Sequence, residues 1–185
     1  MIQTLYIICH GQSESSLQGI VSGGIDTSLT EKGREDAKKA AEKITKEVDV
    51  LFYSPLKRAK ETGGIIAKEL GIENVQEAED LRERFYGDIE GLTSAEAAPL
   101  ITKYFPTKGK NWKIEAPNIE SYPAVINRIK DFMEWLQERH SGQVVALSTH
   151  EDMGQMLRAV MEGLTWEEAL ELPPMQNGEV LEYEL

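Results

Sequence analysis

Short apolar runs of strand length, separated by segments of helical period, constrain the fold of this chain more than any other feature. Residues 2–8, 48–53 and 143–148 are largely apolar, which is typical of strands buried on both faces of a sheet. Residues 179–185 alternate between apolar and acidic side chains and predict a half-exposed edge strand, and residues 75–78 form a shorter candidate. This alternation of strands with helices predicts an α/β fold.

Candidate helix starts lie between the expected strands. Thr30 precedes a segment of helical period that runs to about Lys46, and threonine is a favourable N-cap residue. Ser54 directly follows the second expected strand and precedes Pro55, a residue type favoured at the first position of a helix. We therefore expect Ser54 to cap a helix after that strand.

Two further helices complete the expected layers. Ser121 precedes residues 122–140, in which apolar side chains recur on one face, and a last clear helix is expected after His150. Helices that connect parallel strands cover both faces of the sheet. The expected architecture is a three-layer α/β/α sandwich with a mostly parallel central sheet.

The chain has the length of one ordinary domain, which we place at residues 1–185. The stretch between Gly91 and Ser121 contains proline, glycine, four lysines and Trp112 and has no clear period. Long irregular segments inside a domain are commonly functional. We expect a mobile lid or insertion at about residues 92–120.

Composition limits the classes of function. The net charge of −12 argues against nonspecific nucleic-acid binding, which needs a basic surface. The sequence shows no membrane-length apolar stretch and no charged-then-apolar leader, so we expect a cytoplasmic protein without membrane association. Cys9 is the single cysteine, and the three histidines lack close spacing, so we expect neither a disulfide nor a metal site.

Chemically active side chains directly follow two of the expected strands. His10-Gly11-Gln12-Ser13 comes after the first strand, and Ser148-Thr149-His150 closes the third. The carboxyl ends of strands in such a sheet are where ligands bind, and Gly11 lets backbone amides approach an anion. Each histidine alone is more often a hydrogen-bonded structural residue.

Two charged residues stand in comparable places. Arg58 lies in Ser54-Pro55-Leu56-Lys57-Arg58, where its guanidinium can fork onto two phosphate oxygens beside a helix N-terminus. Glu83 follows Leu81-Arg82 and precedes Gly87, Glu90 and Gly91. If each is considered alone, the favoured interpretation is a solvated arginine for Arg58 and a surface charge for Glu83. Together with two histidines, they offer a nucleophile, a charge stabiliser and a proton donor.

In this order, the four motifs resemble the histidine phosphatase superfamily, whose members are phosphoglycerate-mutase-like enzymes. Leu29-Thr30-Glu31-Lys32-Gly33 and the pair Glu120-Ser121 with Arg128 extend the resemblance over nearly the whole chain. It implies a phosphoglycerate-mutase-like fold and transfer of a phosphoryl group through a phosphohistidine.

The resemblance also implies a role for each motif residue. His10 is the nucleophile that becomes phosphorylated, Glu83 donates the proton to the leaving oxygen, and Arg58 and His150 bind the phosphoryl group together with Gly11. The scheme needs no metal and no cofactor. A neutral imidazole that attacks in line, with cations around the transferring oxygens, is chemically reasonable for this reaction.

The nucleophile motif departs from the superfamily's pattern. That pattern is Arg-His-Gly, whereas this chain has Cys9-His10-Gly11, so one of two expected phosphate-binding arginines is absent. Ser16 stands where asparagine is usual, and Glu151 stands where glycine commonly follows the second histidine. Cys9 as a nucleophile of the cysteine-phosphatase kind is disfavoured, because those enzymes need an arginine six positions later and Ser15 is there.

Three functions remain open at this point. The leading expectation is a phosphomonoesterase that acts on a small phosphorylated metabolite. The alternative is a catalytically impaired pseudo-phosphatase that binds a phosphorylated ligand or partner, which Cys9 favours, and a phosphoglycerate mutase is less expected because the chain is short. A further open alternative is that Cys9 is an engineered or sporadic change in an otherwise active enzyme. The substrate and the oligomeric state, with a dimer as one option, stay open.

Overall fold

A five-stranded sheet forms the centre of the computed structural model, which describes residues 1–104 and 114–185. The strands lie in the order β3-β2-β6-β1-β7, and β1, β2, β3 and β6 run parallel. β7 pairs antiparallel with β1 at the edge. Their bounds are Thr4–Cys9 for β1, Val50–Tyr53 for β2, Val75–Glu77 for β3, Val144–Thr149 for β6 and Val180–Glu184 for β7.

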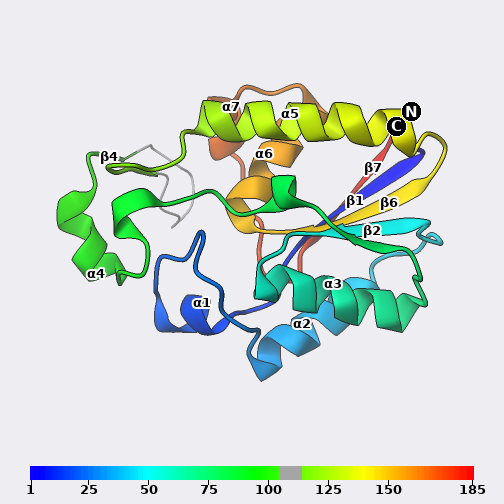
Figure 1. The fold of residues 1–185 in the computed structure, drawn as a ribbon, viewed down its shortest axis with the longest axis horizontal. Helices are drawn as coiled ribbons and strands as arrows, with labels where there is room; N and C mark the ends of the chain where they lie inside the picture. Colours follow the sequence, from blue (N-terminus) through cyan, green and yellow to red (C-terminus); the bar gives the residue numbers. More distant parts are fainter. Residues whose placement is uncertain (105–113) are drawn as a thin grey trace.

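Helices cover both faces of this sheet, as Figure 1 shows. α2 (Glu31–Ala41) and α3 (Lys57–Leu70) pack on one face, while α5 (Tyr122–Arg139), α6 (Glu151–Glu162) and α7 (Trp166–Leu170) lie on the other. Every residue of β1 and β6 is buried, because both strands are central and covered on both sides. The expected three-layer α/β/α sandwich with a mostly parallel sheet is confirmed.

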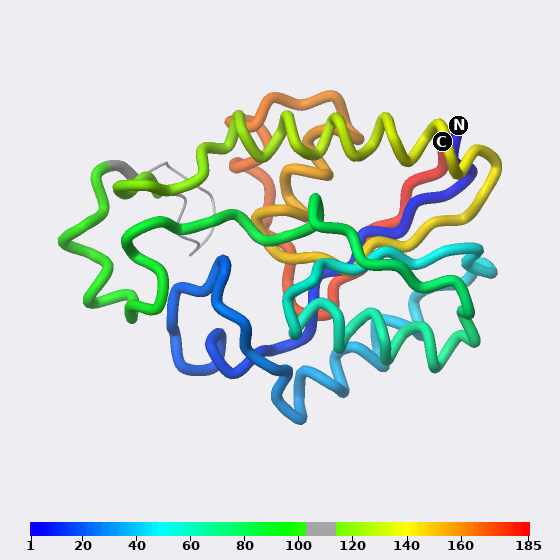
Figure 2. The backbone as a smooth tube through the Cα atoms, viewed as in Figure 1, coloured from blue at the N-terminus to red at the C-terminus, as the bar shows by residue number. Residues whose placement is uncertain are grey.

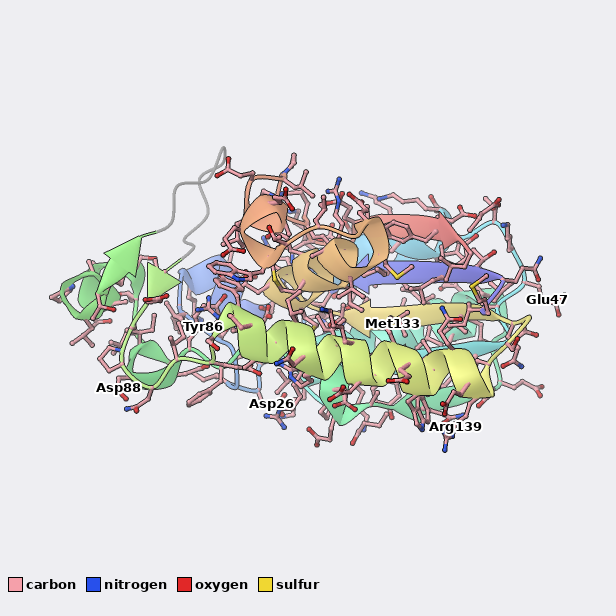
Figure 3. The ribbon with its side chains drawn as sticks, turned by 90° about the horizontal axis from the view of Figure 1, so that it is seen from above. Asp26, Glu47, Tyr86, Asp88, Met133 and Arg139 are labelled. Carbon is pink, nitrogen blue, oxygen red and sulfur yellow. The ribbon has the colours of Figure 1, made fainter. Side chains whose placement is uncertain are left out.

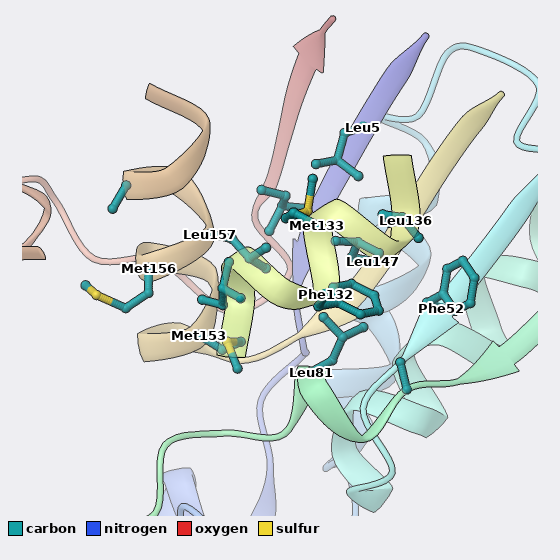
Figure 4. Packing of buried hydrophobic residues seen from close by; sticks show 14 of the residues in the cluster. Leu5, Phe52, Leu81, Phe132, Met133, Leu136, Leu147, Met153, Met156 and Leu157 are labelled. Carbon is teal, nitrogen blue, oxygen red and sulfur yellow. The ribbon is translucent and has the colours of Figure 1, made fainter. Parts of the chain in front are cut away.

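The larger of the two sheet-face cores lies under α5 and α6. Figure 4 shows Phe132, Met133 and Leu136 of α5 close to Leu147 of β6. Leu136 lies four positions after Phe132 and three after Met133, so the three side chains share one face of the helix. The amphipathic pattern of α5 is thus the sequence feature that closes this side of the sheet.

The predicted strands are confirmed, with ends that shift by one or two residues. Two helix predictions need correction. The helix after Thr30 ends at Ala41 rather than near Lys46. The helix after Ser54 begins at Lys57, with Leu56 as its N-cap and no side-chain cap, so the prediction that Ser54 caps it is wrong.

Ser54 does not cap α3 because its hydroxyl has another partner. Ser54 Oγ lies 2.7 Å from Nε2 of His150, so it is directed to the residue that follows β6 and not to the start of α3. It also accepts a long hydrogen bond of 3.4 Å from the Leu56 N–H, one residue before the helix begins. Two short helices, α1 (Glu14–Gln18) and α7, were not predicted, because five residues carry too little period to recognise.

The segment expected to be a lid or insertion extends beyond the carboxyl end of the sheet. It contains α4 (Ser94–Ala97), a 3-10 turn (Ala98–Leu100) and a two-stranded ladder of β4 (Lys103–Tyr104) and β5 (Ile114–Glu115). Figure 2 follows this path and shows the two chain termini close together at the opposite end of the molecule. Figure 3 places Tyr86 and Asp88 toward the extension and Glu47 and Arg139 at the far end.

A small apolar core of its own supports the extension. Ile89, Ala97, Ile114 and Ala116 are buried together and pack against Val21. Backbone hydrogen bonds of Val21 with Gly91 and Leu92 attach the loop after α1 to this core. The extension is therefore joined to the loop that follows the first strand. Whether it moves as a lid stays a prediction.

The packing of α3 on the sheet can be tested at two adjacent glycines. A Cβ at Gly63 would lie 3.1 Å from Leu51 Cδ2 and 3.3 Å from Ser148 Cβ, whereas a Cβ at Gly64 would meet nothing. Gly64→Ala should raise the free energy of unfolding by about 0.5–1 kcal/mol, because alanine favours a helix interior. Gly63→Ala should lower it by about 1–3 kcal/mol through crowding, as measured by urea denaturation. Equal stabilisation by both changes would contradict the close contact at Gly63.

Candidate active site

Three strand ends meet at one edge of the sheet, and each carries a side chain of the site. His10 follows β1, Ser54 follows β2, and His150 follows β6. The rings of His10 and His150 lie with centroids 5.1 Å apart at an angle of 68°. Because β6 pairs with both β1 and β2, the sheet register brings these loops together.

His10 has one ring nitrogen committed and the other directed into the site. Its Nδ1 lies 2.7 Å from the carbonyl oxygen of Gly11, and its Nε2 lies 3.1 Å from Nε of Arg58. Burial and then the Arg58 charge lower the pKa of His10 from 6.5 to about 3. The neutral ring therefore carries its proton on Nδ1 and a lone pair on Nε2, the form needed for nucleophilic attack.

Arg58 is the buried cation of the site, with only 1% of its surface exposed. Its Nε donates toward His10 Nε2 at 3.1 Å and toward His150 Nδ1 at 3.2 Å. The two terminal nitrogens donate to three carbonyl oxygens, which belong to Ser22, Gly23 and Ile25. Burial lowers the pKa of Arg58, while the Glu83 charge opposes that shift.

His150 is fixed between Arg58 and Ser54. Its Nδ1 faces the Arg58 N–H, and its Nε2 lies 2.7 Å from Ser54 Oγ. Burial, the Arg58 charge and His10 hold the pKa of His150 well below its usual value. His150 is therefore neutral, with its proton on the nitrogen that faces Ser54.

Glu83 lies half-buried on the other side of the site. Its Oε1 accepts hydrogen bonds from the backbone N–H groups of Arg84, at 2.9 Å, and Met153, at 3.2 Å. Burial and then the Asp152 charge raise the pKa of Glu83 from 4.5 to about 7, against the Arg84 N–H and the Arg58 charge. A carboxyl group of this kind can donate a proton near neutral pH.

A buried ion pair lies behind Glu83. Arg84 and Asp152 are 0% and 1% exposed, and NH1 of Arg84 lies 3.3 Å from Oδ2 of Asp152. The hydroxyls of Tyr86 and Tyr122 donate to the same oxygen at 2.9 and 3.2 Å. The Arg84 guanidinium stacks 3.8 Å above the Tyr122 ring centre. This cluster anchors the segment that carries Glu83 to the start of α6.

Cys9 is a buried thiol at the end of β1 that lines the same pocket. Burial and then the charges of Glu151, Glu83 and Glu179 raise the pKa of Cys9 well above its usual value. Its thiol is therefore protonated at neutral pH and is a poor nucleophile.

A cavity of about 400 Å³ opens in front of these residues. The site residues Cys9, His10, Arg58 and Glu83 form one part of its lining, and Glu151 lies beside them. Small and apolar side chains from the loop after α1 and from the extension form another part, namely Ile20, Val21, Ala97, Ile101 and Ile114. The volume suits a small molecule whose polar end contacts His10 and Arg58.

Comparisons with known proteins identify the family of this chain. The family model described as histidine phosphatase superfamily (branch 1) matches residues 5–185. The chain belongs to the histidine phosphatase superfamily.

Individual relatives in this superfamily carry different names. The chain is 31% identical to a metal-independent phosphoserine phosphatase of Arabidopsis thaliana, over 89% of this chain and 69% of that protein. It is also 31% identical to a 2,3-bisphosphoglycerate-dependent phosphoglycerate mutase of Parvibaculum lavamentivorans, over 100% of this chain and 91% of that protein. The solved structure of Bacillus stearothermophilus YhfR is 26% identical, with a TM-score of 0.82 over 98% of this chain and 91% of that one. At this level, the relatives support a phosphatase-type function for this member.

The structure brings the four expected side chains of the site together, whereas the Gly11 N–H, an expected donor to an anion, is paired within the protein. His10, Arg58, Glu83 and His150 converge, Cys9 lines the pocket, and the Gly11 N–H is held by Thr62 Oγ1 at 3.2 Å. Of the four lysines in the expected lid or insertion, Lys108, Lys110 and Lys113 lie outside the described residues, and Lys103 contributes its backbone to β4. Among residues 1–104 and 114–185, no cluster of three or more histidine, cysteine or carboxylate side chains is placed to hold a metal ion.

Several neighbours of the site in this superfamily member were not predicted. Ser54 directly follows a strand, as His10 and His150 do, and this position was the available signal for a place in the site. The carbonyl groups of residues 22–25 and the Arg84–Asp152 pair carry no local signal, because their partners lie far away in sequence.

No helix in the described part of the chain has the length and apolar character to span a membrane.

The elevated pKa of Glu83 has a consequence for stability. Between about pH 4.5 and 7 the folded protein binds a proton at Glu83 that the unfolded chain releases, so the free energy of unfolding falls as the pH rises through this window. Glu83→Gln removes the titrating group, and with it this loss of stability at higher pH, while it keeps an acceptor oxygen. The melting temperature of the variant, relative to the parent, should therefore be higher at about pH 8 than at about pH 4. Glu47→Gln, at an exposed position, is the control, and a pH-independent difference for Glu83→Gln would contradict the shifted pKa.

Proposed function

We propose that this protein is a phosphomonoesterase that acts through a phosphohistidine at His10 on a small phosphorylated metabolite. One observation carries the proposal: the His10 ring is neutral, its Nδ1 is held by the Gly11 carbonyl, and its Nε2 faces the buried guanidinium of Arg58. A nucleophile with a fixed tautomer beside a fixed cation is the arrangement that phosphoryl transfer needs.

The first half of the reaction forms the phosphoenzyme. His10 Nε2 attacks phosphorus, the N–P bond forms, and the P–O ester bond breaks with its electron pair on the leaving oxygen. Glu83 donates its proton to that oxygen and the alcohol departs. Arg58 binds the phosphoryl oxygens as its Nε–H moves from His10 to one of them. The Gly11 N–H and His150 join it once the N–H turns from Thr62 and the imidazole presents a protonated nitrogen in place of the one that now faces Ser54.

The second half returns the enzyme to its starting state. Water attacks phosphorus, the N–P bond breaks with its electron pair returning to His10 Nε2, and Glu83 takes a proton from the water. Inorganic phosphate is released. Each step uses only protein groups and water, so we propose a reaction that depends on neither a metal nor a cofactor. The protein is expected to act in the cytoplasm on a free metabolite.

The alternative is an impaired pseudo-phosphatase that binds a phosphorylated ligand. The neutral, buried thiol of Cys9 favours it, because the superfamily's pattern has an arginine at this position and Glu83 and Glu151 lie near Cys9. Loss of one preorganised donor to a transition state costs on the order of 100- to 1000-fold in rate. A mutase is less supported, since Arg58 is the one cationic side chain among the described residues that line the pocket.

Replacement of the nucleophile tests the proposal directly. His10→Ala should abolish hydrolysis of a panel of phosphate monoesters assayed without added metal. The variant should still fold, because His10 lies on a loop and Arg58 Nε–H keeps His150 as an acceptor, but its melting temperature should fall because one acceptor is lost. Acid quenching of the parent with a ³²P-labelled ester should trap an acid-labile phosphoprotein that the variant lacks. Parent-level turnover by His10→Ala would eliminate His10 as the nucleophile.

Cys9→Arg tests the cause of any impairment. A second guanidinium beside Arg58 should raise kcat/KM for phosphate monoesters roughly 100-fold or more and tighten phosphate binding measured by calorimetry. Cys9→Met, an uncharged substitution, is the control for altered packing. A folded Cys9→Arg variant with neither effect would show that Cys9 is not the limiting defect, and the pseudo-phosphatase would become the better assignment.

A further inference from the structure

The carbonyl groups that hold Arg58 come from a short loop, residues 22–25. Ser22 and Gly23 accept from NH2 of Arg58 at 2.9 and 3.0 Å, and Ile25 accepts from NH1 at 2.8 Å. Three acceptors on one guanidinium fix both its plane and its direction. The direction of Arg58 Nε toward the two histidines therefore depends on where this loop lies.

One carboxylate fixes the tip of that loop. Glu90 Oε1 accepts a hydrogen bond from the Gly24 N–H at 2.8 Å and a second from the Tyr86 N–H at 3.0 Å. Gly24 lies between the residues whose carbonyls hold Arg58, and Tyr86 lies three residues after Glu83. A single oxygen of Glu90 thus joins the loop that orients Arg58 to the segment that carries Glu83.

The loop also lies unusually close to the same segment. A Cβ added at Gly23 would collide with the Arg84 carbonyl oxygen and would lie 2.5 Å from Glu90 Oε1. A Cβ at Gly24 would lie 3.7 Å from its nearest neighbour, the Phe85 ring, which is an ordinary contact. Gly23 alone is therefore required for the approach that lets Glu90 reach the loop.

We propose that Glu90 is a positioning residue for Arg58, which aims the guanidinium at the phosphoryl group by fixing residues 22–25 against the segment that carries Glu83. The inference rests on the proposed phosphatase function and adds a residue to it. Glu90 contacts no reacting atom and acts through the loop. Its charge also opposes the lowering of the Arg58 pKa by burial, so it supports the charged form of the guanidinium.

Four single variants test this proposal. Glu90→Ala removes the acceptor, Glu90→Gln keeps an acceptor oxygen, Gly23→Ala blocks the close approach, and Gly24→Ala is its matched control. Orthovanadate binding is measured by calorimetry on the folded protein, and hydrolysis of phosphate monoesters gives kcat and KM. The ¹⁵N–¹H signal of Arg58 Nε, assigned by its loss in Arg58→Lys, reports the guanidinium directly.

The proposal expects the two disruptive variants to behave alike. Glu90→Ala and Gly23→Ala should each weaken vanadate binding about tenfold or more and shift the Arg58 Nε signal, because small displacements of a positioned group are costly in such a site. Glu90→Gln should restore most of the affinity, and Gly24→Ala should match the parent. A purely structural role would lower the melting temperature without moving the Arg58 signal or the affinity of the folded fraction.

The outcomes separate this inference from the function on which it rests. A folded Glu90→Ala variant with the parent's Arg58 signal and affinity would overturn the proposal, as would equal effects of Gly23→Ala and Gly24→Ala. If Glu90→Ala fails to fold, the vanadate affinity and the Arg58 Nε signal of Gly23→Ala, compared with those of Gly24→Ala, decide whether the loop positions Arg58. If the parent neither binds vanadate nor hydrolyses any ester, the phosphatase assignment fails, and the Arg58 signal alone decides whether Glu90 positions the guanidinium.

Discussion

A single buried cation determines much of the organisation of this site. Arg58 is almost fully withdrawn from water, which is costly for a charge unless its donors are satisfied. Three loop carbonyls and two imidazole nitrogens satisfy them. These partners come from the loops after β1 and β6 and from the loop after α1. The requirement to solvate one guanidinium therefore draws segments far apart in sequence to the same strand ends.

The fold meets this requirement through the order of its strands. β6 lies between β1 and β2, so the strand ends that are followed by His10, Ser54 and His150 are neighbours at one edge of the sheet. The segment with Glu83 reaches the site from the other direction. The Met153 N–H, which donates to Glu83, and the Arg84–Asp152 pair hold this segment against α6. The sheet thus supplies the nucleophile side, and the chain after β3 supplies the acid side.

The sequence predicted the part of this arrangement that local patterns encode. Apolar runs predicted the strands, polar residues at their ends predicted His10 and His150, and Arg58 was predicted from its place near the start of the helix after the second strand, because the carboxyl ends of parallel strands meet at one edge. Ser54 was misassigned, since a serine before proline is an equally good helix cap. Glu90 and Asp152 gained their roles from partners that are distant in sequence, and no periodicity records such contacts. Those contacts follow from the packing of the loops, which the sequence pattern does not determine.

Burial acts on the nucleophile and the acid in opposite senses, and both senses favour the same chemistry. A dry environment disfavours every charged form, so it lowers the pKa of His10 to about 3 and raises the pKa of Glu83 to about 7. Between these values, the imidazole is a free base and the carboxyl is a proton donor. Arg58 strengthens the first effect and opposes the second, whereas Asp152 strengthens the second. The separation of the two pKa values therefore depends on Arg58 facing the histidines while Asp152 lies behind Glu83, a geometry that the two loops impose.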